Sequence, residues 1–188
     1  LLDEPFNVRG EIIDVSAVPR GRRVRTDVWF EDQQGQRVIS AVRTSLRPDL
    51  TVANKGGAGE RPQPVIGDPT QLQSLNEYTL TPERVKAYSM EGNSIHYEQE
   101  AAEQAGFRAP LIGGGMGVHY LTAELWRRYS PKAFNADIYF RRPIFWDESV
   151  RVGVQLSASD HWSAMAVLKQ DDTAKVGTEI ALRDLVPA

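Results

Sequence analysis

The chain has 188 residues, enough for one large domain or for one ordinary domain with an appended segment. Hydrophobic residues make up 41% of the chain and charged residues 25%, which is ordinary for a soluble globular protein. The formal net charge of -3 gives no support to nucleic-acid binding, because proteins that bind nucleic acids usually carry a basic face. The absence of cysteine excludes disulfides, thiolate nucleophiles and cysteine-based zinc sites.

Metal and membrane signals are also missing from the sequence. The three histidines lie far apart, at His96, His119 and His161, so we expect no metal site. No run approaches the roughly 20 apolar residues of a membrane helix, so we expect no membrane span and a cytoplasmic location. The sequence opens at Leu1 rather than Met, which leaves open an upstream segment or a targeting peptide. The basic cluster from Arg20 to Arg25 is a candidate phosphate site.

The N-terminal part has a β pattern. Apolar and polar residues alternate in two runs between Phe6 and Arg47, and the two runs are separated by a turn from Asp32 to Gly35. An earlier run surrounds Ile12. These features predict a three-stranded antiparallel meander, which needs a covering layer to be stable.

The end of the chain repeats this pattern between Val150 and Leu182, and acidic pairs, Asp3-Glu4 and Asp147-Glu148, precede the two regions. We interpret the similarity as an internal repeat, in which residues 1–49 are the second half of a domain whose helix and first strands are absent from this chain. The alternative is an N-terminal sheet extension that never belonged to such a domain.

Between the two regions, residues 50–76 are rich in Gly, Pro and polar residues and are predicted to form a linker. Thr81-Pro82-Glu83 is typical of a helix start, and the helix is expected to reach about Tyr88. A second short helix is predicted from Glu98 to Ala105, where Gly106 ends it.

The longest helix is predicted from Gly114 to Tyr129. Val118, Leu121 and Leu125 recur on one apolar stripe of this helix, and Glu124 falls off the stripe. We therefore expect the stripe to face the core.

Two stretches carry most of the chemistry. The first runs from Tyr88 to His96 and offers the carboxylate of Glu91, the carboxamide of Asn93 and the imidazole of His96 on a turn. The second is Gly113-Gly114-Gly115, which leaves the first N–H groups of the longest helix bare to stabilise negative charge on an oxygen. An acid/base pair beside such a site suits the addition of water to an unsaturated acyl group, or the removal of water from a hydroxyacyl group.

These stretches resemble the motif of the MaoC-like family of hotdog-fold enzymes, the (R)-specific enoyl-CoA hydratases and 3-hydroxyacyl thioester dehydratases. Asn93 and His96 match the motif, while Glu91 stands where the family has Asp and Ser94 where it has Pro. The resemblance extends over about residues 80–186.

The second half of the family motif is also recognisable. Gly106-Phe107 and Pro110 keep its spacing, Gly113 takes the position of its second His, and Gly114 falls on its oxyanion glycine. Further on, the stretch from Phe140 to Asp147 is similar to the start of a family strand.

The resemblance implies an α+β hotdog fold for residues 77–188, with a long central helix wrapped by a curved antiparallel sheet, and makes residues 1–49 a partial second hotdog sheet. It implies hydration of an enoyl-CoA or dehydration of a 3-hydroxyacyl-CoA, with His96 and Glu91 as acid/base groups and the Gly114 N–H as oxyanion donor. Such chemistry needs no metal or redox cofactor, and CoA is part of the substrate. The expected partners are an acyl-CoA thioester and a second copy of the chain or the missing hotdog half.

Each candidate residue has a structural alternative. His96 could simply hold the backbone, Glu91 could be a surface carboxylate or a helix cap, and Asn93 is expected to stabilise the turn through a positive φ. Tyr88, Gly113, Gly115 and Thr122 are candidates to bind substrate, and packing is the alternative role of these four residues. At the level of the whole chain, the alternatives are a non-catalytic assembly or acyl-binding subunit and a hotdog acyl-CoA thioesterase.

Overall fold

The structure is a computed structural model, and it describes residues 4–49, 51, 62–90, 92–158, 160–171 and 174–188. The chain divides into two compact units, residues 1–63 and residues 64–188. The candidate residue Glu91 and the glycine-rich stretch from Lys55 to Gly59 lie outside the described residues.

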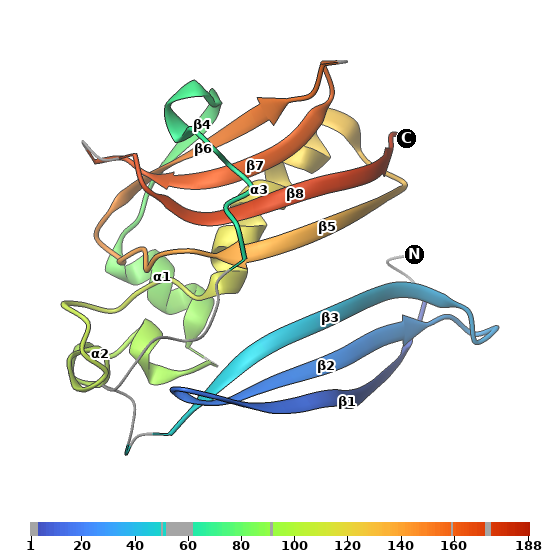
Figure 1. Cartoon of the computed structure of the whole chain (residues 1–188). Coiled ribbons are helices and arrows are strands. Elements are labelled where there is room, and N and C mark those ends of the chain that lie inside the picture. The colour runs from blue at the N-terminus through green and yellow to red at the C-terminus, as the bar shows by residue number, and fades with distance from the viewer. Residues whose placement is uncertain (1–3, 50, 52–61, 91, 159, 172–173) are drawn as a thin grey trace. The chain divides into compact units, whose positions relative to one another are not determined.

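The first unit is the predicted antiparallel meander. Its strands are β1 (Asn7–Val18), β2 (Gly21–Glu31) and β3 (Arg37–Pro48), hydrogen-bonded in the order β1-β2-β3 (Figure 1). Gly21 permits the first turn, because its φ is +140° and a Cβ there would lie 2.2 Å from the carbonyl oxygen of Arg47. At the second turn, Asp32 Oδ1 accepts hydrogen bonds from the backbone N–H groups of Gln34 and Gln36.

One face of this sheet is apolar. The register places Val8 opposite Phe30 and Phe30 opposite Ile39, and Ile12 lies on the same face. Val8, Ile12 and Ile39 are exposed, and the described part of the first unit contains no helix to cover them. The covering layer that the pattern requires is therefore not supplied within this unit.

The second unit contains a five-stranded antiparallel sheet with the strand order β4-β6-β7-β8-β5 (Figure 1). The strands are β4 (Gln73–Thr79), β5 (Ala133–Phe140), β6 (Ser149–Leu156), β7 (Trp162–Lys169) and β8 (Val176–Val186). The helices are the short 3-10 helices η1 (Pro69–Gln71) and η2 (Ser94–His96) and the α-helices α1 (Pro82–Ser89), α2 (Gln99–Gln104) and α3 (Gly114–Tyr129).

Helix α3 spans the predicted range and contributes its apolar stripe to the main core. Leu121 and Leu125 are buried together with Val150, Val152 and Met165 from the sheet. Burial of such aliphatic side chains supplies most of the stability of a domain of this size.

Glu124 was predicted to lie off the apolar stripe of α3, yet this residue is only 8% exposed. Its carboxylate accepts hydrogen bonds from Tyr78 Oη at 2.7 Å and Asn76 Nδ2 at 3.1 Å, and it pairs with Arg127. Those partners replace the water that an exposed carboxylate would bind, which is why the group can be buried.

The opposite face of the sheet is covered by residues 64–72, within the expected linker 50–76. Ile66 and Leu72 are buried there against the sheet. Glu179, only 1% exposed, accepts hydrogen bonds from the backbone N–H groups of Val65 at 2.9 Å and Ile66 at 3.2 Å, and it pairs with Arg141 at 2.5 Å. The second half of the expected linker is thus packed onto the domain, and β4 already begins at Gln73.

Candidate active site

The predicted polar turn is a short 3-10 helix, η2, that carries His96 at its end. Asn93 caps this helix, since its Oδ1 accepts a hydrogen bond from the backbone N–H of Ile95 at 3.3 Å. The φ of Asn93 is -71°, so the expectation of a positive φ at this residue is wrong. Asn93 holds the turn through its side chain rather than through an unusual backbone conformation.

The imidazole of His96 is oriented by a backbone carbonyl. Its Nδ1 lies 2.8 Å from the oxygen of Leu111. A carbonyl oxygen can only accept, so Nδ1 must carry the proton of this bond, and Nε2 of the neutral ring is left with a free lone pair. The ring is therefore held in the tautomer that a general base requires.

The carbonyl that orients His96 is itself fixed from both sides. The backbone N–H of Leu111 donates to the oxygen of Ile95 at 3.3 Å, and Leu111 also forms an antiparallel bridge with Phe145. The next residue, Ile112, donates its N–H to the oxygen of Ile144 at 2.9 Å. The segment that leads into the glycines is thus pinned to η2 and to the segment before β6.

The N-terminus of α3 meets the imidazole directly. A Cβ added to Gly113, the N-cap of α3, would lie 3.9 Å from Nε2 of His96. Among the residues that the structure describes, no side chain caps this helix end, so none of them occupies the N–H groups of its first turn as a capping group. The structure therefore brings together the imidazole and the positive end of a helix dipole, as the two sequence stretches predicted.

The next two glycines contact aromatic side chains. A Cβ on Gly114 would lie 2.6 Å from Cε1 of Phe140, and a Cβ on Gly115 would lie 3.1 Å from the hydroxyl of Tyr88. The ring of Tyr88 packs edge-on against His119 with centroids 5.3 Å apart. Partial burial raises the pKa of Tyr88, and the hydroxyl, which like that of any tyrosine is protonated at neutral pH, is able to donate a hydrogen bond.

The remaining candidate residues are Thr122, on helix α3, and Glu91, which lies outside the described residues. The Thr122 hydroxyl lies 3.0 Å from the oxygen of Val118 one turn earlier in α3, a bond within the helix. Next to the undescribed Glu91, the backbone N–H of Gly92 donates to the oxygen of Ser89 at 2.9 Å. The hydroxyl of Ser89 is buried and has no hydrogen-bond partner among the described residues.

Two residues of the site were not predicted as such. Leu111 acts through its backbone oxygen, and the identity of its side chain gives no sign of that. Phe140 was identified only as part of a strand start, although the alternation of Phe134, Ala136 and Ile138 before it marks a strand that ends beside the glycines.

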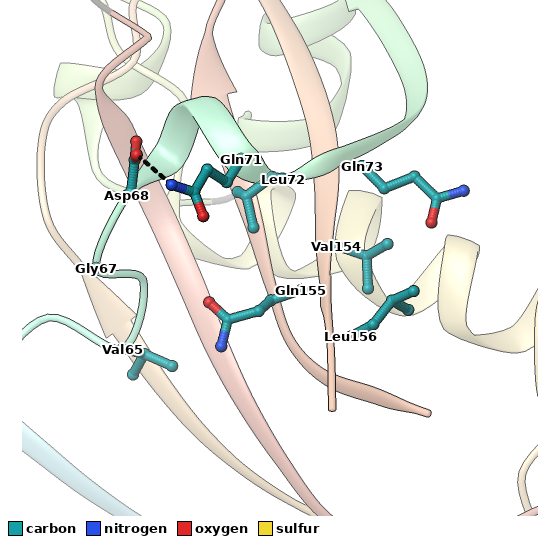
Figure 2. Close-up of a pocket in the computed structure, with 9 residues that line it drawn as sticks. All are labelled: Val65, Gly67, Asp68, Gln71, Leu72, Gln73, Val154, Gln155 and Leu156. Carbon is teal, nitrogen blue, oxygen red and sulfur yellow. Dashed lines mark hydrogen bonds between the residues drawn. The ribbon is translucent and has the colours of Figure 1, made fainter. Parts of the chain in front are cut away.

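A separate hollow of about 550 Å³ lies beside Gln73, the first residue of β4 (Figure 2). Its lining consists of Val65, Gly67, Asp68, Gln71, Leu72, Gln73, Val154, Gln155 and Leu156. Asp68 is its only ionisable group, and the carboxylate is already bonded to Thr70 and Gln71. The hollow shares no residue with the site at α3.

Neither a metal centre nor a membrane helix is found in the described part of the chain. It contains no group of three or more His, Asp or Glu side chains placed to hold a metal ion. Among the same residues, no helix is both long and apolar enough to cross a membrane.

Comparison with known proteins identifies the fold. No protein-family model matches the sequence, and no curated protein matches it. Among solved structures, HtdX from Mycobacterium tuberculosis superposes with a TM-score of 0.74 at 18% identity, covering 96% of this chain and 69% of that chain. A MaoC-like dehydratase from Phytophthora capsici superposes with a TM-score of 0.67 at 18% identity, covering 96% of this chain and 64% of that one.

The chain has the MaoC-like hotdog fold. The peroxisomal multifunctional enzyme type 2 from Drosophila melanogaster shares this fold with a TM-score of 0.64 at 21% identity, and the match covers 94% of this chain but 33% of that one. The likeness to these MaoC-like hotdog proteins concerns the fold, and the chain spans only part of each of them.

Proposed function

We propose that the chain is a hydro-lyase that reversibly adds water to an enoyl-CoA, or removes it from a 3-hydroxyacyl-CoA. The observation that carries the proposal is the position of His96. Its Nδ1 is engaged by the Leu111 carbonyl, and its Nε2 lies beside Gly113 at the N-terminus of α3, which no described side chain caps. A base and an anion-stabilising helix end therefore lie close enough to act on one substrate.

In the proposed reaction, His96 and Glu91 hold a water molecule and remove one of its protons. The hydroxide oxygen bonds to the β-carbon of the enoyl group, and the electron pair of the double bond moves toward the thioester oxygen. The Gly114 N–H donates to that oxygen as enolate charge develops, because the first turn of a helix favours negative charge. The proton then returns to the α-carbon, so one water is added and no redox cofactor takes part.

The other candidate residues have subsidiary roles in this proposal. The glycines at positions 113 and 115 leave room for the thioester beside the helix, and Tyr88 presents a protonated hydroxyl to the same turn. Asn93 keeps η2 in place through its cap, and Thr122 packs within α3.

Loss of the enoyl thioester absorbance during incubation with enoyl-CoA substrates tests the proposal. We expect His96→Ala and Glu91→Gln to lower turnover by about a hundredfold or more, as for removal of a positioned acid/base group. His161→Ala is the matched control, because that residue lies in the turn between β6 and β7 and is exposed. Parental turnover in both site variants would show that the reaction occurs elsewhere.

The variant Glu91→Asp tests whether the turn around residue 91 fits the longer side chain of Glu or whether Glu at this position has weakened the activity. Shortening the side chain by one methylene moves its oxygens by about 1.5 Å, which is enough to misplace a bound water. We expect turnover to fall if the turn is adapted to Glu91. A rise in turnover would favour the reading that this chain has lost much of its chemistry.

The same assay, with free thiol measured in parallel, distinguishes a hydratase from the two alternative functions, a hotdog thioesterase and a non-catalytic subunit. A thioesterase releases CoA and therefore thiol, a hydratase changes only the enoyl band, and a non-catalytic subunit changes neither. A thioesterase would also need a carboxylate or its water directed at the thioester carbon.

We also propose that the β1–β3 sheet is a partial hotdog and that the protein is at least a dimer or binds the missing hotdog half. Within the described residues, the outer edges of this sheet pair with no further strand, and the sheet has exposed apolar side chains; both features favour association. Sedimentation at micromolar concentration tests this, and a monomer with a well-ordered β1–β3 sheet would contradict it.

A further inference from the structure

Strand β5 has a row of apolar side chains on one face, and this row is partly buried at its N-terminal end and exposed to solvent at its C-terminal end. Phe134 and Ala136 pack against the main core, and Ile138 and Phe140 continue the same row because alternate residues share a face. Ile138 is 40% exposed and Phe140 is 62% exposed. We call these last two residues the β5 strip.

The β5 strip lies at the end of the row where helix α3 starts with glycines. Phe140 lies against the backbone of Gly114, where an added Cβ would lie 2.6 Å from Cε1 of the ring. The apolar surface therefore begins at the helix turn that would hold a thioester oxygen.

The position of the β5 strip beside the candidate active site favours a role in binding a ligand. An apolar surface that adjoins convergent polar groups is the usual composition of a small-molecule site. Here the polar groups are Nε2 of His96 and the first turn of α3, and Phe140 touches the second of these. Side chains two apart on a strand are separated by roughly 7 Å, so the strip is long enough to lie along several methylene groups.

We propose that the β5 strip binds the apolar acyl chain of the thioester, and that Phe140 sets a preference for longer chains over short ones. This inference rests on the proposed function, because it places the chain relative to the reacting carbons. A short acyl group ends near His96 and does not reach along the strip. A longer one lies over the ring of Phe140 and over Ile138.

Substitution of Phe140 tests the assignment through the dependence on chain length. We expect Phe140→Ala to lower kcat/KM for trans-decenoyl-CoA about tenfold, since burial against the ring involves several methylene groups. We expect crotonyl-CoA, whose acyl chain is short, to change less than about twofold, and Phe140→Leu to keep most of the preference. Tyr139→Ala is the control, because Tyr139 is the neighbouring residue on the opposite face of β5.

Calorimetric titration with saturated acyl-CoAs separates this inference from the proposed reaction, because these compounds have no double bond to hydrate. Decanoyl-CoA should bind Phe140→Ala about tenfold more weakly than the parent, and butyryl-CoA should bind both equally. Such a difference without any turnover would support the strip and overturn the hydratase proposal. Turnover with equal losses for both chain lengths would overturn the strip and leave the hydratase proposal standing.

Three further results would also overturn the inference. Failure of the parent to bind decanoyl-CoA more tightly than butyryl-CoA would show that no apolar chain is held there. A gain in decenoyl-CoA activity on Phe140→Ala would show that the ring blocks the chain. Dissociation of an oligomer by Phe140→Ala, with no change in chain-length preference, would assign the strip to an interface between copies.

Discussion

Replacement of His96 by Asn separates the structural role of the imidazole from its chemical role. The Asn side chain has an N–H group near the place of Nδ1, so it can keep the bond to the Leu111 oxygen, but nothing near the place of Nε2. His96→Ala loses both groups. The hydrogen bond at 2.8 Å joins half-buried groups, so its loss should cost about 1 kcal/mol of unfolding free energy.

For a chain of this size, about 1 kcal/mol corresponds to a fall in Tm of roughly 2–5 °C. We therefore expect His96→Ala to melt a few degrees below the parent and His96→Asn to melt close to it. Both should lose activity by about a hundredfold or more, because neither retains a base at Nε2.

Thermal unfolding by circular dichroism and the enoyl absorbance assay, run on the same preparations, measure the two effects. Near-parental activity in His96→Asn would refute the assignment of Nε2 as the base. Equal melting of His96→Ala and the parent would refute the structural role of the bond to Leu111.

Three other predictions concern stability. The Arg108 guanidinium donates two hydrogen bonds, at 2.8 and 2.9 Å, that lower the pKa of Asp147, so this stabilisation is present near neutral pH and disappears as pH falls through the lowered pKa. Both side chains are about half exposed, so urea unfolding should show Asp147→Asn less stable by at most about 1 kcal/mol at neutral pH, with a gap that narrows as pH falls below the ordinary pKa of Asp; a constant gap would contradict the linkage. Glu179→Gln breaks a buried ion pair and should cost about 3–5 kcal/mol in the same assay, whereas a loss below about 1 kcal/mol would mean that the neutral amide satisfies the same donors. Gly117→Ala places a Cβ 2.6 Å from Thr178 Oγ1 in the core and should cost about 1–3 kcal/mol, and Thr178→Ala in the same chain should restore most of it if this contact is the cause.

The fold could be predicted where local pattern and tertiary structure agree. Alternation of apolar residues marks the strands of the β1 to β3 meander and the strands β6 and β8, whereas β7 is a continuous apolar run because both of its faces are buried. Helix α3 has a clear start at the glycines and a stripe with helical period, so its range was predicted correctly.

The edge strands β4 and β5 were missed for identifiable reasons. In β4 the register shifts between Ser74 and Asn76, so Leu75 and Tyr78 both pack against the core although they are three residues apart. An odd spacing of this kind breaks the period of two that marks a strand. In β5 the alternation is present, but its polar members are Asn135 and Asp137, residue types that are rare in strands.

The packing of residues 64–72 could not be predicted from local sequence, because the group that holds it is far away in the chain. Glu179 accepts the two backbone N–H groups from a position more than 110 residues later. Glycine and proline content correctly indicates the absence of regular structure, but it does not exclude docking onto a sheet.

For the site, the sequence correctly predicted the meeting of His96 with the N-terminus of α3, and the family resemblance indicated both stretches. It could not indicate how the imidazole is oriented, because that depends on a backbone carbonyl fifteen residues later. The positive φ expected at Asn93 was also wrong, since the side-chain cap stabilises the turn with an ordinary backbone.

The glycines at the start of α3 do not all serve the same purpose, and their differences bear on whether the site is functional. Close packing explains Gly114 and Gly117, where an added Cβ would lie 2.6 Å from Phe140 and from Thr178. It does not explain Gly113, where an added Cβ would lie 3.9 Å from Nε2 of His96, an ordinary contact distance, and where φ is -62°. Neither packing nor backbone conformation requires glycine at this position. The remaining effect of glycine there is to keep open the space between the free nitrogen of His96 and the first N–H groups of the helix, which is where the reacting carbons of a thioester would lie.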